Sequence, residues 1–118
     1  MTVHDTPERT LLRDQVTRFV AHDVEPYGDA WEREGCVPRG VLRRMGELGW
    51  LGLMVPDAYG GADLDALTNF AFAEALSQST YGGFIVTVLV HTDMASPHLV
   101  NAGTDEQKSR WLPGIISG

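Results

Sequence analysis

The chain has 118 residues, of which 43% are apolar, and a formal net charge of −7. This length suits one domain with its own core, and the composition fits neither a disordered chain nor a membrane protein. The acidic balance argues against nucleic acid or an anionic membrane surface as the main partner. A single cysteine, Cys36, excludes an internal disulfide framework. Because residues 1–8 also lack an apolar targeting segment, we expect a cytoplasmic protein without a membrane span.

The first 50 residues contain clear helix start and stop signals. Thr6 and Pro7 suit a capped helix start. An apolar stripe follows at helical spacing, formed by Leu12, Val16, Phe19 and Val20. Pro26 should kink or interrupt this helix, because it removes an amide donor. A second helix should run from Pro38 to a stop at Gly49. Its inward-facing side chains should be Val41, Leu42, Met45 and Leu48.

The middle of the chain combines a tight turn, a third helix and one ambiguous segment. Residues 55–61 hold a proline and paired glycines, which is the chemistry of a turn. Asp63 or Asp65 can cap the third helix. That helix carries Leu67, Phe70, Ala71, Ala75 and Leu76. The β-branched residues of 84–90 favour a strand, which could pair with residues 50–55 in a βαβ unit. Two strands make a poor sheet, however, and a buried helix would be equally apolar, so we predict a helix.

The last third predicts two helices separated by Gly103. Residues 96–102 form the first, and Thr104 with Gln107 supplies a capping box for the second, Asp105 to Ile116. With a helix at 84–90, the chain is predicted to be all-α, an orthogonal or up-down bundle of about five to six helices. No lysine or arginine occurs between Arg44 and Lys108. The phosphates of any nucleotide-tailed ligand must therefore be held elsewhere in the molecule.

Three short segments occur in a recognisable order and spacing. The first joins Leu48-Gly49-Trp50-Leu51-Gly52-Leu53 to Val55-Pro56 and Tyr59-Gly60-Gly61. The second is Phe72-Ala73-Glu74-Ala75-Leu76, and the third combines Ala102-Gly103-Thr104, Glu106-Gln107-Lys108 and Trp111-Leu112-Pro113. Together they make the chain, from about Thr6 to Gly118, resemble the N-terminal helical domain of the acyl-CoA dehydrogenase family. The resemblance covers the first third of a family member and supports a helix at 84–90.

The resemblance implies a three-domain flavoprotein dehydrogenase, of which residues 1–118 are a single helical domain, the first, with the later domains absent. In this family a glutamate removes the α proton of an acyl thioester while the β hydrogen passes as hydride to FAD. The glutamate and most flavin contacts lie in the later domains. We therefore assign no catalytic or cofactor-binding residue, and we expect this fragment alone to be inactive and not to bind FAD tightly. An electron-transfer flavoprotein or another acceptor is the implied redox partner, and homo-oligomerisation or self-association is expected.

The resemblance also implies a site. In the family, the helix matching residues 84–94 forms a wall of the acyl-chain pocket. Val86, Val90 and Met94 lie at i, i+4 and i+8 with Thr87 adjacent, and we predict that these four residues line the substrate pocket. Such a stripe would bury an acyl chain at about 0.8 kcal/mol per methylene. The alternative is that the same residues are ordinary bundle core.

Two histidines and a glutamate are further candidate site residues. His91 and His98 lie seven residues apart, with Asp93 close by, and would share a face of one continuous helix. Without further ligands, and with Pro97 expected to break the geometry between them, they predict no metal site. Glu74 is expected to be a satisfied or exposed carboxylate. Two other functions stay open: a non-catalytic helical protein-interaction module, and a family relative acting on a carrier-protein thioester or a nitroalkane.

Overall fold

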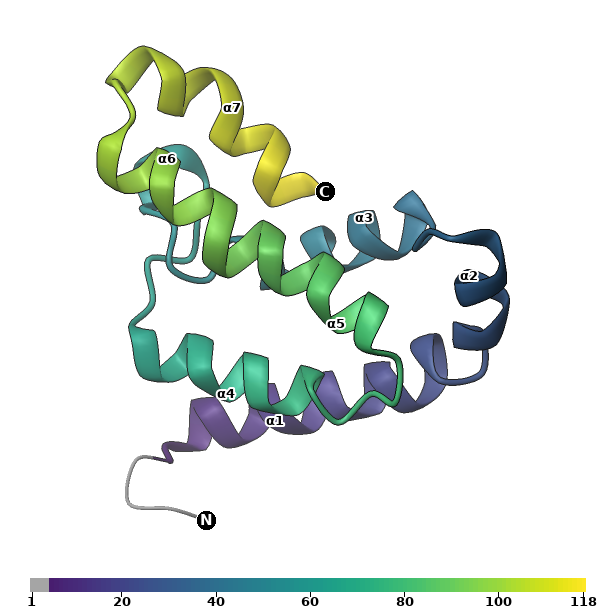
Figure 1. The fold of residues 1–118 in the computed structure, drawn as a ribbon. Helices are drawn as coiled ribbons and strands as arrows, with labels where there is room; N and C mark the ends of the chain where they lie inside the picture. Colours follow the sequence, from purple (N-terminus) through teal and green to yellow (C-terminus); the bar gives the residue numbers. More distant parts are fainter. Residues whose placement is uncertain (1–4) are drawn as a thin grey trace.

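The computed structural model describes residues 5–118, and over this range it contains helices and no strand. Residues 1–4, part of the N-terminus that was predicted to carry no targeting signal, lie outside this range. The helices form six rods (Figure 1). Their bounds are α1 Pro7–Phe19 with the π-helical turn η1 Val20–Val24, α2 Gly28–Glu34, α3 Arg39–Glu47, α4 Ala66–Leu76, α5 Gly82–Leu89 with η4 Val90–Ala95 and α6 Ser96–Ala102, and α7 Asp105–Ser117. The all-α prediction is confirmed.

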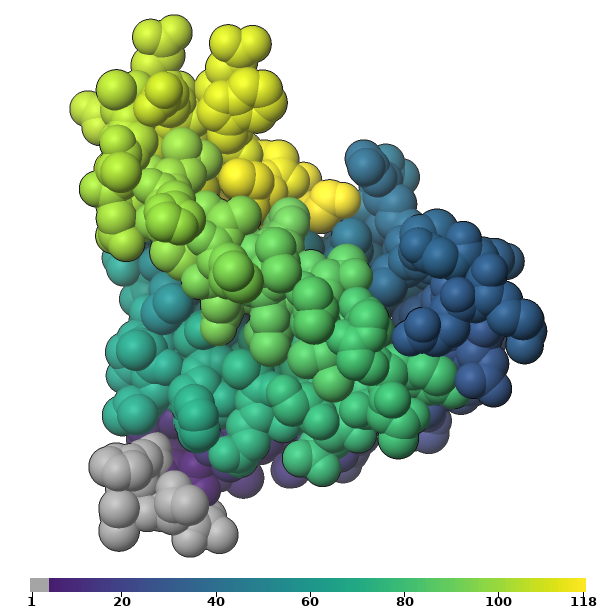
Figure 2. All heavy atoms as spheres, viewed as in Figure 1, coloured from purple at the N-terminus to yellow at the C-terminus, as the bar shows by residue number. Residues whose placement is uncertain are grey.

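The segment 84–90 is helical, as predicted, and belongs to the longest rod. In this rod α5, η4 and α6 follow one another without a break, and the rod crosses the face turned to the viewer in Figures 1 and 2. Phe84 and Val88 lie on its buried side and join the core. Burial on one side of a helix therefore outweighs the strand preference of the β-branched residues.

Three helices begin at the predicted caps. The Thr6 hydroxyl accepts a hydrogen bond of 3.2 Å from the amide of Arg9 at the start of α1. Of the two candidates for α4, Asp65 is the cap, and its Oδ1 accepts from the Thr68 amide at 2.9 Å. The capping box of Thr104 and Gln107 is present at α7. Each cap satisfies amide donors that have no partner within the first helical turn.

The turn at residues 55–61 depends on both of its glycines, for different reasons. Gly60 has a φ of +92°, which favours glycine. Gly61 is required by space, because a Cβ at this position would lie 2.0 Å from the carbonyl oxygen of Val55. This segment contains the short 3-10 turn η3 Asp57–Tyr59 and returns the chain to the start of α4. Its role is structural.

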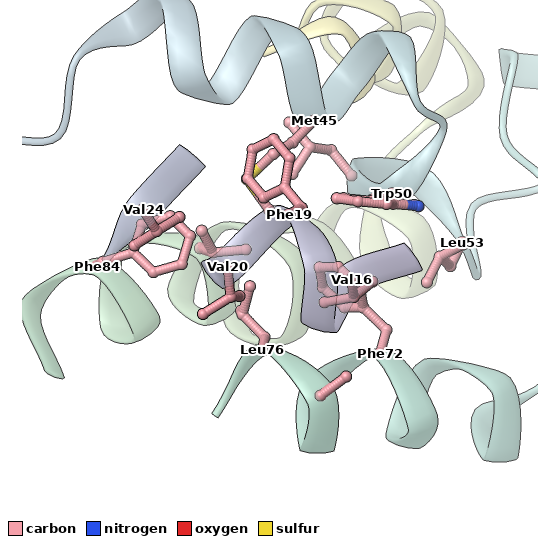
Figure 3. Packing of buried hydrophobic residues seen from close by; sticks show 13 residues of the cluster. Val16, Phe19, Val20, Val24, Met45, Trp50, Leu53, Phe72, Leu76 and Phe84 are labelled. Carbon is pink, nitrogen blue, oxygen red and sulfur yellow. The ribbon is translucent and has the colours of Figure 1, made fainter. Parts of the chain in front are cut away.

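The buried core gathers side chains from four of the rods, α1 with η1, α3, α4 and α5, and from the 3-10 turn η2 Trp50–Gly52 and Leu53 after it (Figure 3). Phe19 and Trp50 meet edge to face, with ring centroids 5.2 Å apart. Fully burying a residue of this kind contributes roughly 1.5–3 kcal/mol. The prediction that Leu48 faces inward is wrong: it is 39% exposed, because it follows the last residue of α3 and the chain turns there at Gly49, whose φ is +82°.

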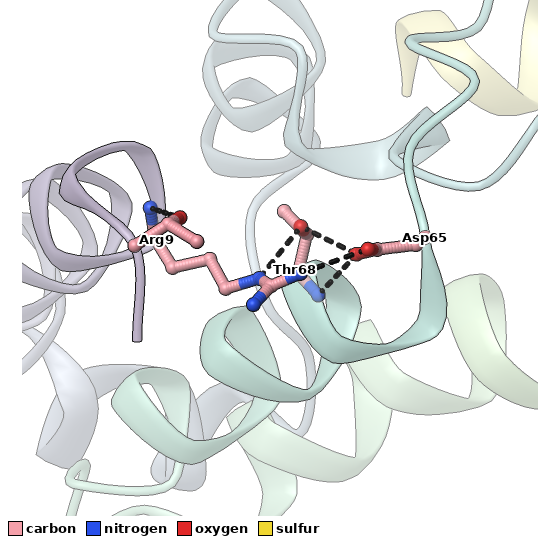
Figure 4. Close-up of polar contacts among 4 residues, drawn as sticks. Arg9, Asp65 and Thr68 are labelled. Carbon is pink, nitrogen blue, oxygen red and sulfur yellow. Dashed lines mark hydrogen bonds and ion pairs between the residues drawn. The ribbon is translucent and has the colours of Figure 1, made fainter. Parts of the chain in front are cut away.

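Polar contacts fix α1 against α4 (Figure 4). The Arg9 guanidinium lies 2.8 Å from Asp65 Oδ2 and donates to the Thr68 hydroxyl at 3.3 Å. One turn further on, Arg13 lies 2.5 Å from the Glu74 carboxylate. These partly exposed pairs contribute modest stability, and they set the register between the two helices.

Each of the two π-helical turns ends two residues before a proline. Pro26 follows η1, and the helix stops there as predicted. Pro97 follows η4, but the helix continues through it, so the expectation that Pro97 breaks the helix is wrong. A proline ring clashes with the carbonyl four residues earlier, and a wider turn relieves this clash. No helix within residues 5–118 is long and apolar enough to cross a bilayer.

Candidate functional site

Val86, Val90 and Met94, which we call the candidate wall, lie on the outer side of the rod 82–102. Their side chains are 59%, 41% and 62% exposed. Phe84 and Val88, on the same α5, are buried. The alternative in which the wall residues are ordinary bundle core therefore does not fit the structure. Three exposed apolar side chains along one helix are instead typical of a surface that another molecule or domain covers.

Thr87 lies beside the candidate wall and not within its line. Its hydroxyl donates to the carbonyl oxygen of Gly83 at 2.7 Å. The residue borders a small hollow of ≈ 160 Å³ between α2 and α5, where it faces Trp31 and Phe84. Of the four predicted substrate-lining residues, the structure thus brings three into one line and places the fourth at its edge.

A larger cavity of ≈ 340 Å³ lies on the other side of the same rod, and the sequence did not predict it. Its walls are mostly apolar and come from the segment after α3, from α4, and from η4 and α6. Three buried polar side chains border it: Asn69, Thr92 and Ser96. The sequence signal was the pair Thr92 and Ser96, two small polar residues four apart in an apolar helix. Among residues 5–118, no titratable side chain lines this cavity, so these residues offer it no acid–base chemistry.

The two histidines of the rod do not form a metal site. His91 Nε2 lies 2.6 Å from the carbonyl oxygen of Ile115, which joins η4 to α7. Because a carbonyl oxygen only accepts, Nε2 carries the hydrogen in this contact. Among residues 5–118 no group of three or more His, Cys, Asp or Glu side chains is arranged to hold an ion.

The titratable groups with shifted pKa values serve the fold. Hydrogen bonds from the hydroxyl and amide of Thr68, and the nearby Arg9 charge, hold the pKa of Asp65 below its ordinary value. The hydrogen bond from the Tyr81 hydroxyl to Asp29 raises the pKa of Tyr81. Neither group borders the candidate wall. Glu74 is paired with Arg13, as expected for a satisfied carboxylate.

The candidate wall does not fit the charged part of a dinucleotide. The pyrophosphate of FAD needs cationic or amide donors, and the stretch containing the wall has no lysine or arginine between Arg44 and Lys108. Exposed valine and methionine side chains suit hydrocarbon instead. The wall can therefore bury an apolar chain, and the groups that hold a flavin nucleotide must come from elsewhere.

Comparison with known proteins gives a family match over nearly the whole chain. Residues 6–118 match the family described as "Acyl-CoA dehydrogenase, N-terminal domain". The chain is 32% identical over 113 residues to the mitochondrial long-chain specific acyl-CoA dehydrogenase of Rattus norvegicus, covering 94% of this chain and 25% of that protein.

Solved structures agree with the sequence comparison. Acyl-CoA dehydrogenase from Geobacillus kaustophilus superposes with a TM-score of 0.89 at 29% identity, over 99% of this chain and 30% of that one. Acyl-CoA dehydrogenase complexed with FAD from Bacillus anthracis gives a TM-score of 0.83 at 30% identity, over 99% of this chain and 20% of that one. The chain spans 19% to 30% of the length of the curated relatives it matches.

Proposed function

The chain belongs to the acyl-CoA dehydrogenase family, as its N-terminal domain, and on this premise we propose that its protein oxidises the Cα–Cβ bond of acyl thioesters. The candidate wall, formed by Val86, Val90 and Met94, would be one side of the acyl-chain pocket, with Thr87 at its edge. The observation that carries this proposal is the line of three apolar side chains, each at least 41% exposed. The relatives named above are dehydrogenases, which favours this proposal over a stand-alone interaction module.

In this proposal the residues of the chain bind and orient the substrate. An acyl chain lying along the wall would gain about 0.8 kcal/mol for each methylene removed from water. Packing of the acyl chain against the candidate wall would also exclude water from the reacting carbons. FAD, when bound by the later domains of the protein, supplies the hydride acceptor.

Several further features of the protein follow as proposals. Residues 1–118 would be the first of three domains, and the base and the flavin site would lie in the other two. An electron-transfer flavoprotein or another acceptor would reoxidise the flavin. The protein would be cytoplasmic, which is supported by the single cysteine of residues 1–118. The exposed apolar residues support contact with the later domains or, in the isolated fragment, self-association that light scattering would detect.

The test of the pocket is Val90→Trp in the complete protein. Filling the wall should shorten the preferred acyl chain and lower kcat/KM for long-chain thioesters at least tenfold relative to short ones. A matched control is Leu67→Trp, since Leu67 on α4 is exposed to a similar degree, 45%. An unchanged chain-length profile in Val90→Trp would count against the assignment.

The test of the reaction is a panel of thioesters, on CoA and on a carrier protein, with an artificial electron acceptor. Oxidation of saturated thioesters by the complete protein, and none by residues 1–118 alone, is the expected result. Absence of turnover with every thioester would favour the interaction module. Stoichiometric flavin absorbance in purified residues 1–118 would contradict the proposed division between domains.

A further inference from the structure

The π-helical turn η4 contains two of the three residues of the candidate wall, Val90 and Met94. The amide of Ser96 donates to the carbonyl oxygen of His91, five residues back, which is the hydrogen bond that defines such a turn. The Ser96 hydroxyl donates to the same oxygen. Ser96 is only 2% exposed, so this second donor is fixed inside the protein.

The wider turn keeps the wall residues in line. In a regular α-helix, residues four apart drift around the axis by about 40° per step, so Val86 and Met94 would diverge by about 80°. A π turn has more residues per turn and rotates the chain the other way. The burial pattern agrees: a second line at four-residue spacing, made of Val88, Thr92 and Ser96, is buried throughout.

A polar cluster holds this turn, with Asn69, Thr92 and Ser96 buried and Asp93 exposed. The Thr92 hydroxyl, with one hydrogen to donate, lies 2.7 Å from Asp93 Oδ1 and 3.2 Å from the carbonyl oxygen of Val88. The Asn69 amide nitrogen donates from α4 to the Asp93 carboxylate, with 3.2 Å to each oxygen. These contacts, with that of Ser96, occupy carbonyls and a carboxylate around the turn and fix it to the neighbouring helix.

We propose that Asn69, Thr92, Asp93 and Ser96 are positioning residues for substrate chain length: they hold the π turn and so keep Met94 in line with Val86 and Val90. This inference rests on the proposed function, since it assumes that the wall contacts an acyl chain. Val86 and Met94 are eight residues apart, about 12 Å along the axis. Only a long acyl chain can contact both ends of the wall, and only such a chain should sense the position of Met94.

The experiment compares Ser96→Ala, Met94→Ala and the double variant in the complete protein, with butyryl and lauroyl thioesters. Each single variant should lower the lauroyl-to-butyryl ratio of kcat/KM about fivefold or more, through KM with kcat unchanged. In the double variant the two effects should not add, because Ser96 acts through Met94. Ser96→Thr, which keeps the hydroxyl, should restore most of the ratio.

The control is Ser77→Ala, since the exposed Ser77 directly after α4 makes the same kind of contact, its hydroxyl donating to the Ala73 carbonyl at 2.7 Å. Thr92→Val provides an independent second route, with the same expected loss of ratio. An unchanged ratio in Met94→Ala, or additive effects in the double variant, would overturn the inference while leaving the dehydrogenase activity in place. Absence of turnover by the unaltered protein with either thioester would overturn the proposed function itself, and this inference with it.

Discussion

The two π-helical turns are alike in origin and opposite in outcome. Each ends two residues before a proline, and each closes with an amide donating to the carbonyl five residues back: Glu25 to Val20 at 2.9 Å in the first, and Ser96 to His91 in the second. The first turn, η1, places Val20 and Val24 in the core and ends its helix. The second, η4, lies on the surface that carries the candidate wall, and its helix continues.

The residues around each proline explain the difference. After Pro26 the turn at residues 25–27 leads into α2, whose first residue, Gly28, packs so closely against the Tyr81 ring that a Cβ there would lie 2.2 Å from it. After Pro97 no such contact bends the chain. The buried hydroxyl of Ser96 supports the turn before Pro97, and the helix continues through Pro97 into α6. A proline thus widens the preceding turn, and its neighbours decide whether the helix goes on.

The largest expected difference in unfolding free energy comes from truncating one valine to alanine in each π-helical turn. Val24 in η1 is fully buried, whereas Val90 at the start of η4 is 41% exposed. Val24→Ala should lower the free energy of unfolding by roughly 2–3 kcal/mol, from lost burial and the cavity left behind. Val90→Ala should change it by less than about 0.5 kcal/mol. Urea denaturation of both variants checks the comparison, and equal losses would mean that the two turns do not differ in burial as described.

The difference between the turns was only partly predictable from the sequence. Pro26 and Pro97 were both expected to interrupt a helix, and this is correct for Pro26 alone. A proline in the sequence shows that an amide donor is missing. Whether the helix continues depends on contacts with residues distant in the chain, such as Tyr81 and Asn69. The caps at Thr6 and Thr104 were predicted correctly because their partners lie three residues away. The cavity behind Thr92 could not be predicted, because its walls come from segments that are distant in the sequence.

The second prediction concerns the carboxylate that follows η1. Burial works against ionisation of Glu25, but hydrogen bonds from Ser79 and Thr80 outweigh it and hold its pKa below the ordinary value of 4.5. The Ser79 hydroxyl donates to Oε1 at 2.5 Å, and the Thr80 hydroxyl donates to Oε2 at 2.5 Å. Glu25→Gln should therefore cost about 1 kcal/mol at neutral pH.

The pH dependence gives the sign of this contribution. A carboxyl group whose pKa is lowered on folding stabilises the protein above its unfolded value, and the contribution is lost as the pH falls below about 4.5 through the folded value. The unfolding free energy of the unaltered protein should thus fall more steeply below pH 5 than that of Glu25→Gln. Parallel pH profiles for the two proteins would show that the carboxylate is not held as described.

The smallest change in stability should come from Pro97→Ala, and it tests what keeps η4 in its π form. The substitution adds an amide that can bond within the helix, worth about 0.5–1.5 kcal/mol. It also frees the unfolded chain, which costs about 0.4–1 kcal/mol, so the two effects nearly cancel. If the side chains of Thr92 and Ser96 suffice to hold the turn, the π turn should persist in Pro97→Ala and relax only when Ser96→Ala is added. Backbone chemical shifts and amide exchange across residues 90–97 distinguish these states.

Pro26→Ala is the matched control: Pro26 is exposed and already outside the helix, so only the unfolded-state cost should remain. A return to α-helical shifts in Pro97→Ala alone would mean that the proline imposes the turn and that the polar cluster merely accommodates it.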